Sequence, residues 1–317
     1  MTVLITGGFG YLGARLAQHL ATQAGHAILL GSRQQAEAPQ WLPQAKVAQI
    51  QWDSPTGLEQ CCTGVDAVVH LARMNAQDCA VDPVAALEFN AVGTARLLKA
   101  AIRLGVKRFV YVSTAHVYSN PLHGVITEET CPASLHPYAT SHRAGEDVVR
   151  AAHQRGEFAG IVVRLSNAYG APAHKDANCW MLLVNDLCRQ AVTTQRMALR
   201  SSGLERRNFI TLTDACRAIS HLLELPAAQL SDGLFNVGSG SAPTILEMTE
   251  RVAGRIHAAT GYRPPILRMG EQGGESSEVL HYGIEKLIGT GFSAAIGKDN
   301  VDQEIDGLIR FCLRNMT

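Results

Sequence analysis

Glycines near the start of the chain recur at a spacing that suits close contact with a phosphate. The run is Gly7-Gly8-Phe9-Gly10-Tyr11-Leu12-Gly13, which contains G-x-G-x-x-G after an apolar segment and before a helix-like one. Glycine permits a tight turn and close backbone approach, and a helix N-terminus offers free N–H groups to an anion. The loop therefore predicts a dinucleotide pyrophosphate site, with Gly7, Gly10, Tyr11, Leu12 and Gly13 as the cofactor contacts.

The end of the next apolar segment indicates which dinucleotide is bound. An acidic residue there would bind the ribose hydroxyls of NAD, but this chain has Gly31-Ser32-Arg33. A hydroxyl beside a guanidinium suits a 2′-phosphate, because arginine is a bidentate phosphate partner. Ser32 and Arg33 therefore favour NADP over NAD. The alternative is a solvated Arg33 in a site that takes NAD without the usual carboxylate. Asp53 is a further candidate, as an acceptor for the adenine amino group.

Short apolar runs that alternate with helix-like stretches must position these residues. The runs are strand-sized and apolar throughout, which is typical of a parallel sheet covered on both faces. The expected strands are 3–5, 27–30, 67–69, 109–112 and 161–163, and the expected longer helices are 83–104 and 139–152. The sequence predicts an α/β Rossmann fold, a doubly wound parallel sheet.

The regular alternation fades after about Asn167, which predicts a smaller, mixed α/β C-terminal lobe for the substrate. We expect residues 1–166, with return segments near 208–238, to form the cofactor-binding domain. Residues 167–207 and 239–317 would form the lobe. A short strand is expected within 233–238, and the polar, glycine-bearing stretch 270–277 is expected to be a loop.

Composition excludes several other classes of protein. Lys+Arg and Asp+Glu are equal at 28 each, so no basic excess points to nucleic acid. The longest apolar runs are strand-sized, so no membrane span is expected. The eight cysteines include no Cys-x-x-Cys and no metal-ligand spacing, and we expect reduced thiols and no metal site. Because the first strand begins almost at Met1, no leader peptide and a cytoplasmic location are expected.

Further motifs resemble the extended short-chain dehydrogenase/reductase family, in particular nucleotide-sugar epimerases of the UDP-galactose 4-epimerase type. The resemblance covers nearly the whole chain and begins with Pro137-Tyr138-Ala139-Thr140-Ser141-His142 and the glycine loop. It continues through 68–72, 90–94, 112–118, 164–170, 207–210 and 268–271. The resemblance implies that Leu71, Ala72 and Asn90 lie beside the cofactor.

The resemblance also implies the catalytic residues. In this family a tyrosine phenolate moves the proton during hydride transfer, a nearby Ser or Thr orients the substrate oxygen, and a lysine four residues after the tyrosine lowers its pKa and holds the nicotinamide ribose. Tyr138 and Thr114 match the first two roles. Unperturbed tyrosine has a pKa near ~10, so it needs help to ionise near neutrality.

The lysine position holds His142, which is the main departure from the family pattern. The reference pKa of histidine is ~6.5, against ~10.4 for lysine. A neutral imidazole would still donate one hydrogen bond to the ribose, but it would do little to stabilise a phenolate. Three interpretations stay open: an active enzyme with His142 protonated or backed by another group such as His116, a slow or acid-adapted enzyme, or a protein that binds ligands without turnover.

By resemblance, the substrate site would use Asn167, the Arg207 and Arg268 guanidiniums around a diphosphate, and Glu271. Thr114-Ala115-His116 lacks the Asp-Glu pair that the family's 4,6-dehydratases carry, which disfavours that reaction. We therefore expect an NAD(P)-dependent epimerase or keto-reductase acting on a nucleotide-linked sugar. By resemblance, we also expect a homodimer formed through the helical stretches around 85–104 and 141–152. The alternative is a catalytically weak or inactive NADP(H)-binding regulatory or partner protein of the same fold.

Overall fold

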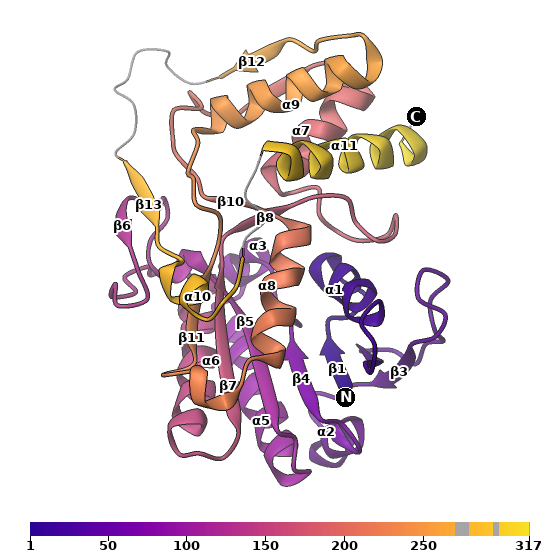
Figure 1. The fold of residues 1–317 in the computed structure, drawn as a ribbon, viewed down its shortest axis with the longest axis vertical. Coiled ribbons are helices and arrows are strands. Elements are labelled where there is room, and N and C mark those ends of the chain that lie inside the picture. The colour runs from indigo at the N-terminus through magenta and orange to yellow at the C-terminus, as the bar shows by residue number, and fades with distance from the viewer. Residues whose placement is uncertain (270–278, 294–297, 317) are drawn as a thin grey trace.

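The computed structural model describes residues 1–269, 279–293 and 298–316. A seven-stranded sheet with helices on both sides forms the larger part of the molecule, and a smaller lobe lies at one end of that sheet (Figure 1). The α/β Rossmann fold that the sequence predicts is confirmed.

All neighbouring strands of the main sheet are parallel, in the order β11-β7-β5-β4-β1-β2-β3. The strand order reverses between β1 and β4, and in open α/β sheets ligands bind at the carboxyl ends of the strands at such a point. The glycine loop follows β1 and therefore begins at this point. The strands are β1 Thr2–Thr6, β2 Ala27–Ser32, β3 Lys46–Gln49, β4 Ala67–His70, β5 Arg108–Thr114, β7 Ala159–Leu165 and β11 Leu234–Val237.

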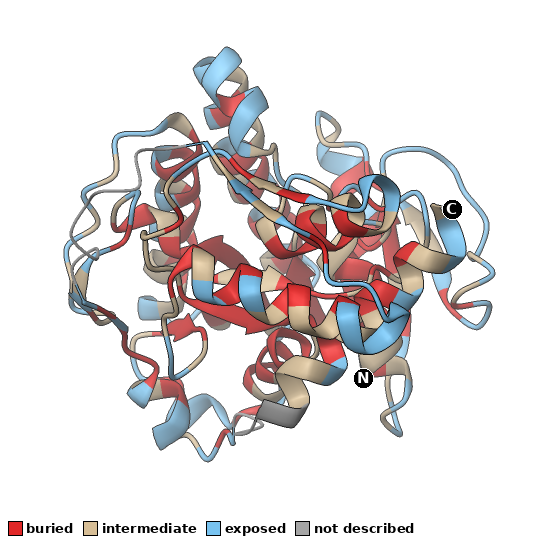
Figure 2. Ribbon diagram, turned by 90° about the horizontal axis from the view of Figure 1, so that it is seen from above, coloured by how far each residue is buried: buried red, intermediate tan, exposed pale blue. Residues whose placement is uncertain are grey.

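Side chains of successive strand residues enter two cores on opposite faces of the sheet, as strand geometry requires. Ile5 packs with α1 (Tyr11–Ala21) and α8 (Leu212–Glu224), whereas Leu4 packs with α2 (Pro55–Cys62), α5 (Thr94–Arg103) and α6 (Pro137–Gln154). Figure 2 shows the resulting buried centre of the molecule, with exposed residues at its margin. Burial on both faces explains why these strands read as unbroken apolar runs.

The predicted helix over 83–104 is a continuous helical segment whose middle part has a different geometry. It consists of α4 (Pro83–Ala86), the π-helical η1 (Leu87–Gly93) and α5, and it follows the short helix α3 (Ala76–Val81). π-helical turns are frequent at functional sites and are not encoded by apolar periodicity. Here the wider turn contains Asn90, which is buried.

The lobe is built from three helices and short strand pairs. Helices α7 (Leu183–Thr194), α9 (Ile245–Thr260) and α11 (Lys298–Asn315) share one apolar core. The expected strand within 233–238 is β11, which joins the main sheet at its edge. The stretch 270–277 lies outside the described residues. The remaining elements are β6 Gly124–Ile126, β8 Asn167–Tyr169, β9 Met197–Leu199, β10 Phe209–Thr211, β12 Ile266–Arg268, β13 Leu280–Tyr282, η2 Ala115–Val117, η3 Ala227–Gln229 and α10 Glu285–Gly289.

Candidate active site

The glycine loop forms a cradle that has no space for side chains. Gly7 has a left-handed φ of 67°, and the N–H of Gly10 donates to the Gly7 carbonyl at 2.9 Å. A Cβ at Gly13 would lie 2.2 Å from that same carbonyl oxygen. Helix α1 begins at Tyr11 directly after this turn, so the first N–H groups of the helix face the loop. The geometry fits the backbone approach that a pyrophosphate needs.

The end of β4 forms the neighbouring wall of the cradle. The Thr6 hydroxyl oxygen accepts from the backbone N–H groups of Leu71 and Ala72 at 3.1 and 3.2 Å. A Cβ at Gly7 would lie 3.0 Å from the Ala72 nitrogen. Leu71 and Ala72 therefore lie directly beside the glycine loop, on the other side of the point where the strand order reverses.

The residues at the adenosine end of the predicted cofactor site differ in whether their side chains already have partners within the protein. Ser32 ends β2, and its hydroxyl accepts from the N–H of Gln34 at 3.2 Å. The exposed Arg33 guanidinium makes no hydrogen bond or ion pair within the described part of the chain. The carboxylate of Asp53 is 96% exposed and lies 3.0 Å from Arg96. Arg33 is thus free to meet a ligand, whereas Asp53 already has a partner.

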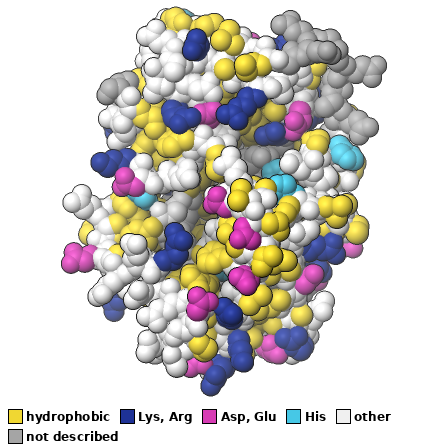
Figure 3. Space-filling view, turned by 180° about the vertical axis from the view of Figure 1, so that it is seen from behind, with side chains coloured by type: hydrophobic (Ala, Val, Ile, Leu, Met, Phe, Trp, Pro, Cys, Tyr) yellow, Lys and Arg dark blue, Asp and Glu magenta, His cyan; other side chains and the backbone are white. Residues whose placement is uncertain are grey.

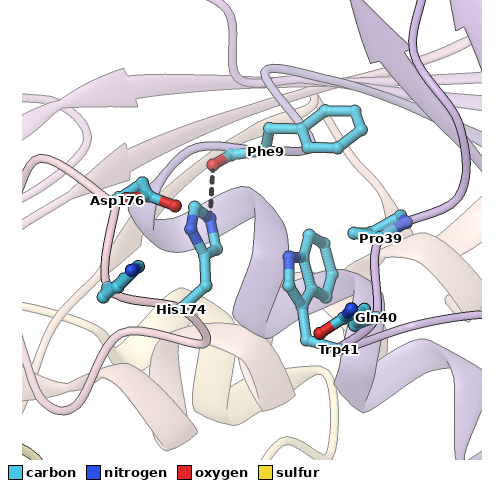
Figure 4. A pocket seen from close by; sticks show the side chains of 7 residues that line it. Phe9, Pro39, Gln40, Trp41, His174 and Asp176 are labelled. Carbon is cyan, nitrogen blue, oxygen red and sulfur yellow. Dashed lines mark hydrogen bonds between the residues drawn. The ribbon is translucent and has the colours of Figure 1, made fainter.

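A cavity of about 710 Å³ lies beside the glycine loop, between the loop after β2 and a loop of the lobe (Figure 4). The ring of His174 is stacked on Trp41 with centroids 5.5 Å apart, and its Nε2 lies 2.9 Å from the carbonyl oxygen of Phe9. Sequence patterns did not indicate either residue, because both lie in loops without regular spacing. The Tyr11 hydroxyl also bonds the lobe, at the Gly170 carbonyl 2.9 Å away, so any contact of Tyr11 with a pyrophosphate falls to its backbone N–H.

Asn90 acts inside the protein. Its side-chain oxygen accepts from the N–H of Met74 at 2.8 Å, and its amide nitrogen donates to the Ser141 hydroxyl at 3.0 Å and to the thiol of Cys79. The side chain thereby ties the loop after β4 to α6. The side chain is buried, so these bonds account for its polar atoms and support a positioning role beside the loop that follows Leu71 and Ala72.

Thr114 and Tyr138 lie where a strand ends and a helix begins. Thr114 is the last residue of β5, and its hydroxyl oxygen accepts from the N–H of His116 at 3.2 Å. Tyr138 is in the first turn of α6, where its N–H donates to Nδ1 of His136. The Tyr138 hydroxyl makes no hydrogen bond within residues 1–269, 279–293 and 298–316. Both hydroxyls come from elements at the carboxyl edge of the sheet.

His142 is buried one turn after Tyr138. The two rings are in edge-to-face contact, with centroids 4.5 Å apart and planes at 68°. Nδ1 of His142 lies 3.0 Å from the Tyr111 hydroxyl on β5. Its Nε2 is buried and has no hydrogen-bond partner in the described structure. An unpaired buried nitrogen is costly unless a ligand satisfies it, so this atom fits a role in holding a cofactor hydroxyl.

The environment keeps His142 and Tyr111 neutral. Burial lowers the pKa of His142 well below its usual value, and the positive charge of Arg73 and the imidazole of His70 lower it further. Burial also raises the pKa of the Tyr111 phenol well above its usual value. The structure therefore disfavours a protonated His142. His116 offers no substitute charge, since burial lowers its pKa as well.

A buried ion pair between Glu146 and Arg164, which the sequence motifs did not indicate, holds α6 against β7. Glu146, one turn beyond His142, accepts from Nη2 of Arg164 at 2.6 Å and from Nε at 3.1 Å, and the two side chains are 1% and 3% exposed. Burial alone would lower the pKa of Arg164, but the hydrogen bond and the charge of Glu146 raise it. Ser113 also donates to Glu146. The i, i+4 spacing from His142 was the available signal, since it puts Glu146 on the buried face.

The lobe places the predicted substrate residues on neighbouring segments. Nδ2 of Asn167 donates to the Asn208 carbonyl at 2.9 Å, and Arg207 pairs with Glu205 at 3.0 Å. Nε of Arg268 donates to the Ser202 carbonyl at 2.7 Å, which ties the end of β12 to the segment that leads to Arg207. Glu271 lies outside the described residues. Seen from behind, the molecule is hollowed between the lobe and the sheet, with Lys and Arg side chains along the upper rim (Figure 3).

Within the described ranges no group of three or more His, Cys, Asp or Glu side chains could hold a metal ion. No helix in the described part of the chain is long and apolar enough to cross a bilayer. All eight cysteines are free thiols, and only Cys131 is exposed.

The sheet order and the glycine cradle define a Rossmann-type dinucleotide-binding fold. A model of the NAD dependent epimerase/dehydratase family matches residues 3–238, and the chain belongs to that family of enzymes.

Curated relatives and solved structures are similar to most of the chain. UDP-glucose 4-epimerase 2 of Arabidopsis thaliana is 26% identical over 312 residues, which cover 90% of this chain and 88% of the relative. The dTDP-glucose 4,6-dehydratase of Streptomyces niveus is 29% identical over 196 residues, or 62% of this chain, and the match spans only 56% of that enzyme.

Two solved structures illustrate the shared fold. UDP-glucose 4-epimerase from Thermotoga maritima, solved with UDP-glucose, superimposes with a TM-score of 0.81 at 19% identity, with full coverage of both chains. RMD from Pseudomonas aeruginosa, solved with NADPH, gives a TM-score of 0.78 at 22% identity and 99% coverage of each chain.

Proposed function

We propose that this protein is an NADP(H)-dependent epimerase or keto-reductase that acts on a nucleotide-linked sugar. The observation that carries the proposal is the contact of Tyr138 with a buried His142 whose Nε2 has no partner in the described structure. This pair lies near the end of the sheet where the glycine loop begins. A proton-transferring phenol beside a cofactor cradle is the arrangement that hydride transfer to or from a sugar carbon requires.

In this proposal each group of residues has a separate role in binding the cofactor or moving the proton. The glycine loop and the first turn of α1 would hold the pyrophosphate, and the cofactor would supply or accept the hydride when bound. The Tyr138 hydroxyl would give a proton to the carbonyl oxygen in reduction, or take one from the hydroxyl in oxidation. Thr114 would orient that oxygen by a hydrogen bond. His142 would donate from Nε2 to a ribose hydroxyl.

Tyr111 fixes the side of the His142 ring that carries the hydrogen in this proposal. Its hydroxyl lies 3.0 Å from Nδ1 of His142 and 3.4 Å from the His142 carbonyl. Donation to Nδ1 is the shorter of the two bonds, and it places the imidazole hydrogen on Nε2. The buried, unpaired atom then becomes a donor, which suits a ribose oxygen.

The choice of NADP is supported by the end of β2. Arg33 is exposed and unengaged within the described residues, and neither it nor Ser32 would repel a 2′-phosphate. In contrast, an NAD site usually has a carboxylate at this position. Similar structures have been solved with NAD and with NADPH.

The affinity of guanidinium groups for phosphate also supports a nucleotide-diphosphate site in the lobe. Arg207 and Arg268 supply the paired guanidiniums that a diphosphate needs, and Asn167 extends from β8 at the start of the lobe. Thr114-Ala115-His116 offers no carboxylate for water elimination, which disfavours 4,6-dehydration. Residues 1–166 with the return segments near 208–238 would form the cofactor domain, and 167–207 with 239–317 the substrate lobe.

The expected homodimer is also part of the proposal. Val84, Leu87 and Val92 are 66%, 46% and 43% exposed on α4 and η1, in the helical region expected to form the subunit interface. An exposed apolar stripe of this kind is typical of a protein contact. Solution mass tests it: a monomer at micromolar concentration would contradict this part of the proposal.

A second candidate is an NADP(H)-binding protein without turnover. It is favoured by the neutral state of His142, which removes the positive charge that the lysine would supply. The experiment that separates the two functions is turnover with NADPH or NADH and a panel of UDP-, GDP- and dTDP-sugars and keto-sugars. The enzyme proposal predicts turnover of at least one substrate. Cofactor binding without turnover across the panel would favour the second candidate.

A further inference from the structure

Arg73 is a cation at the active site that the proposed mechanism does not use. It follows Ala72 in the loop after β4, and its guanidinium carbon lies 6.0 Å from the centre of the Tyr138 ring. Its side chain is exposed and makes no hydrogen bond or ion pair within the described part of the chain. Its field also reaches Tyr111, His116 and His142, whose pKa values it lowers.

The other titratable groups around Tyr138 carry no fixed positive charge. From β5, Tyr111 is kept neutral by burial, and from α3 burial raises the pKa of the Cys79 thiol. On α6, burial keeps His142 neutral, and at the N-cap of that helix Nδ1 of His136 accepts a hydrogen bond from the Tyr138 N–H. Among these groups, Arg73 is therefore the source of positive potential at the phenol.

We infer that Arg73, acting through Tyr138, supplies the positive charge that stabilises the phenolate, while His142 supplies only the hydrogen bond to the cofactor ribose. The two tasks that one lysine could perform would be divided between residues on two elements. This inference rests on the proposed function for its catalytic meaning. The effect of the Arg73 charge on the ionisation of Tyr138 does not depend on a substrate and can be tested without turnover.

The sign of the effect follows from Coulomb's law. A positive charge near a phenol favours the ionised form and lowers its pKa, so removal of the charge raises that pKa. In the oxidative direction Tyr138 must be ionised, and the rate rises with pH through its pKa. Loss of Arg73 moves this limb of the profile to higher pH by about one unit, which lowers the rate on the limb about tenfold.

The experiment compares Arg73→Gln with Arg73→Lys, which keeps the charge. Tyrosinate absorbance is titrated in each variant, and the same titration in its Tyr138→Phe counterpart is subtracted, so the difference reports Tyr138. We expect Arg73→Gln to raise the midpoint by about one unit and Arg73→Lys to leave most of the native value. Arg103→Gln, which removes an equal charge from an ion pair with Glu59, is the control and leaves the midpoint unchanged.

A double variant makes the test sharper. His142→Lys restores a cation beside Tyr138, so it returns the midpoint of the Arg73→Gln protein toward the native value. An unchanged midpoint in Arg73→Gln would overturn the inference, even if the enzyme turns over its substrate. A rise in KM without a shift of the pH profile would also overturn it, because Arg73 would then bind the substrate. A protein without turnover but with the predicted titration would refute only the proposed function.

Discussion

The hydroxyl of Tyr111 lies 3.0 Å from Nδ1 of His142, and the opposite nitrogen of the same ring is buried without a partner in the described structure. This relationship makes a neutral histidine useful at a position where the family pattern has lysine. One nitrogen is held by the protein, and the other is available to a ligand. Gly145 leaves room for the Tyr111 hydroxyl, because a Cβ at that position would lie 2.6 Å from the Tyr111 oxygen.

Replacement of Tyr111 by Phe tests this relationship. Without its hydroxyl partner, the His142 ring would share its hydrogen between both nitrogens, and donation to the ribose would weaken. We expect the Kd for NADPH to rise about tenfold, the scale of one hydrogen bond. Calorimetric titration measures the affinity, and nitrogen NMR shifts of His142 report the tautomer. Tyr118→Phe removes another buried phenol hydroxyl and is the control; equal effects of the two variants would refute the role of Tyr111.

Replacement of Arg33 by Asp tests the cofactor preference. A carboxylate at this position would repel a 2′-phosphate and accept hydrogen bonds from ribose hydroxyls. We expect NADP affinity to fall at least about tenfold and NAD affinity to rise, as charge-assisted bonds at this position would require. The Kd values of both cofactors are measured in the native protein and in the variant. Arg103→Asp makes the same change in charge in the last turn of α5, and it separates the local effect at β2 from the effect of net charge. A native protein that prefers NAD would contradict the assignment.

Glu146→Gln should destabilise the fold strongly, because Arg164 would remain charged and buried without its partner. Loss of one member of a buried ion pair costs about 3–5 kcal/mol. Urea unfolding at neutral pH measures the loss. Glu59→Gln breaks the pair with Arg103, whose side chain is 63% exposed, and should change the midpoint little. Similar losses of stability in both variants would show that burial does not decide how much an ion pair contributes to the free energy of unfolding.

Two buried histidines predict that the protein becomes less stable in acid. Burial lowers the pKa of His70 to about 3 and the pKa of His142 well below its usual value. In the unfolded chain both histidines take up a proton near pH ~6.5, whereas in the folded protein they stay neutral to lower pH. Protonation therefore does not reduce the free energy of unfolding above that pH. Stability is lost as pH falls from ~6.5 toward the folded-state values, by at most about 1.4 kcal/mol per pH unit for each histidine.

Urea unfolding between neutral and mildly acidic pH measures this dependence. His70 accepts from Thr6 through Nδ1 and donates to Thr94 through Nε2, so His70→Gln loses stability at neutral pH. The same variant should be less sensitive to acid, because one buried titrating group is gone. An unchanged slope of stability against pH in His70→Gln would contradict this account of the group.

The sequence predicted the sheet because its strands are buried on both faces and therefore read as apolar runs. It predicted the glycine cradle because close backbone approach restricts residue identity at Gly7 and Gly13. The π-helical turn around Asn90 was not predictable, since its apolar pattern resembles that of an ordinary helix. The division of the chain into two domains stays a prediction.

Parts of the candidate site depend on contacts that no local spacing encodes. Tyr111 lies inside an apolar strand, so its pairing with His142 depends on how α6 packs on β5. Arg73 and His174 lie in loops, where side-chain position follows from tertiary contacts. Glu146 was within reach of sequence reasoning, because its spacing from His142 places a carboxylate on a buried helix face.

The most direct test of the central claim is Tyr138→Phe. The phenol should be needed to move the proton but not to bind the cofactor, so kcat should fall by at least about 100-fold, the low end for loss of a general acid or base. The Kd for NADPH should stay within about twofold of the native value, a difference of less than ~0.5 kcal/mol. An enzyme that keeps its native kcat after Tyr138→Phe would contradict the account.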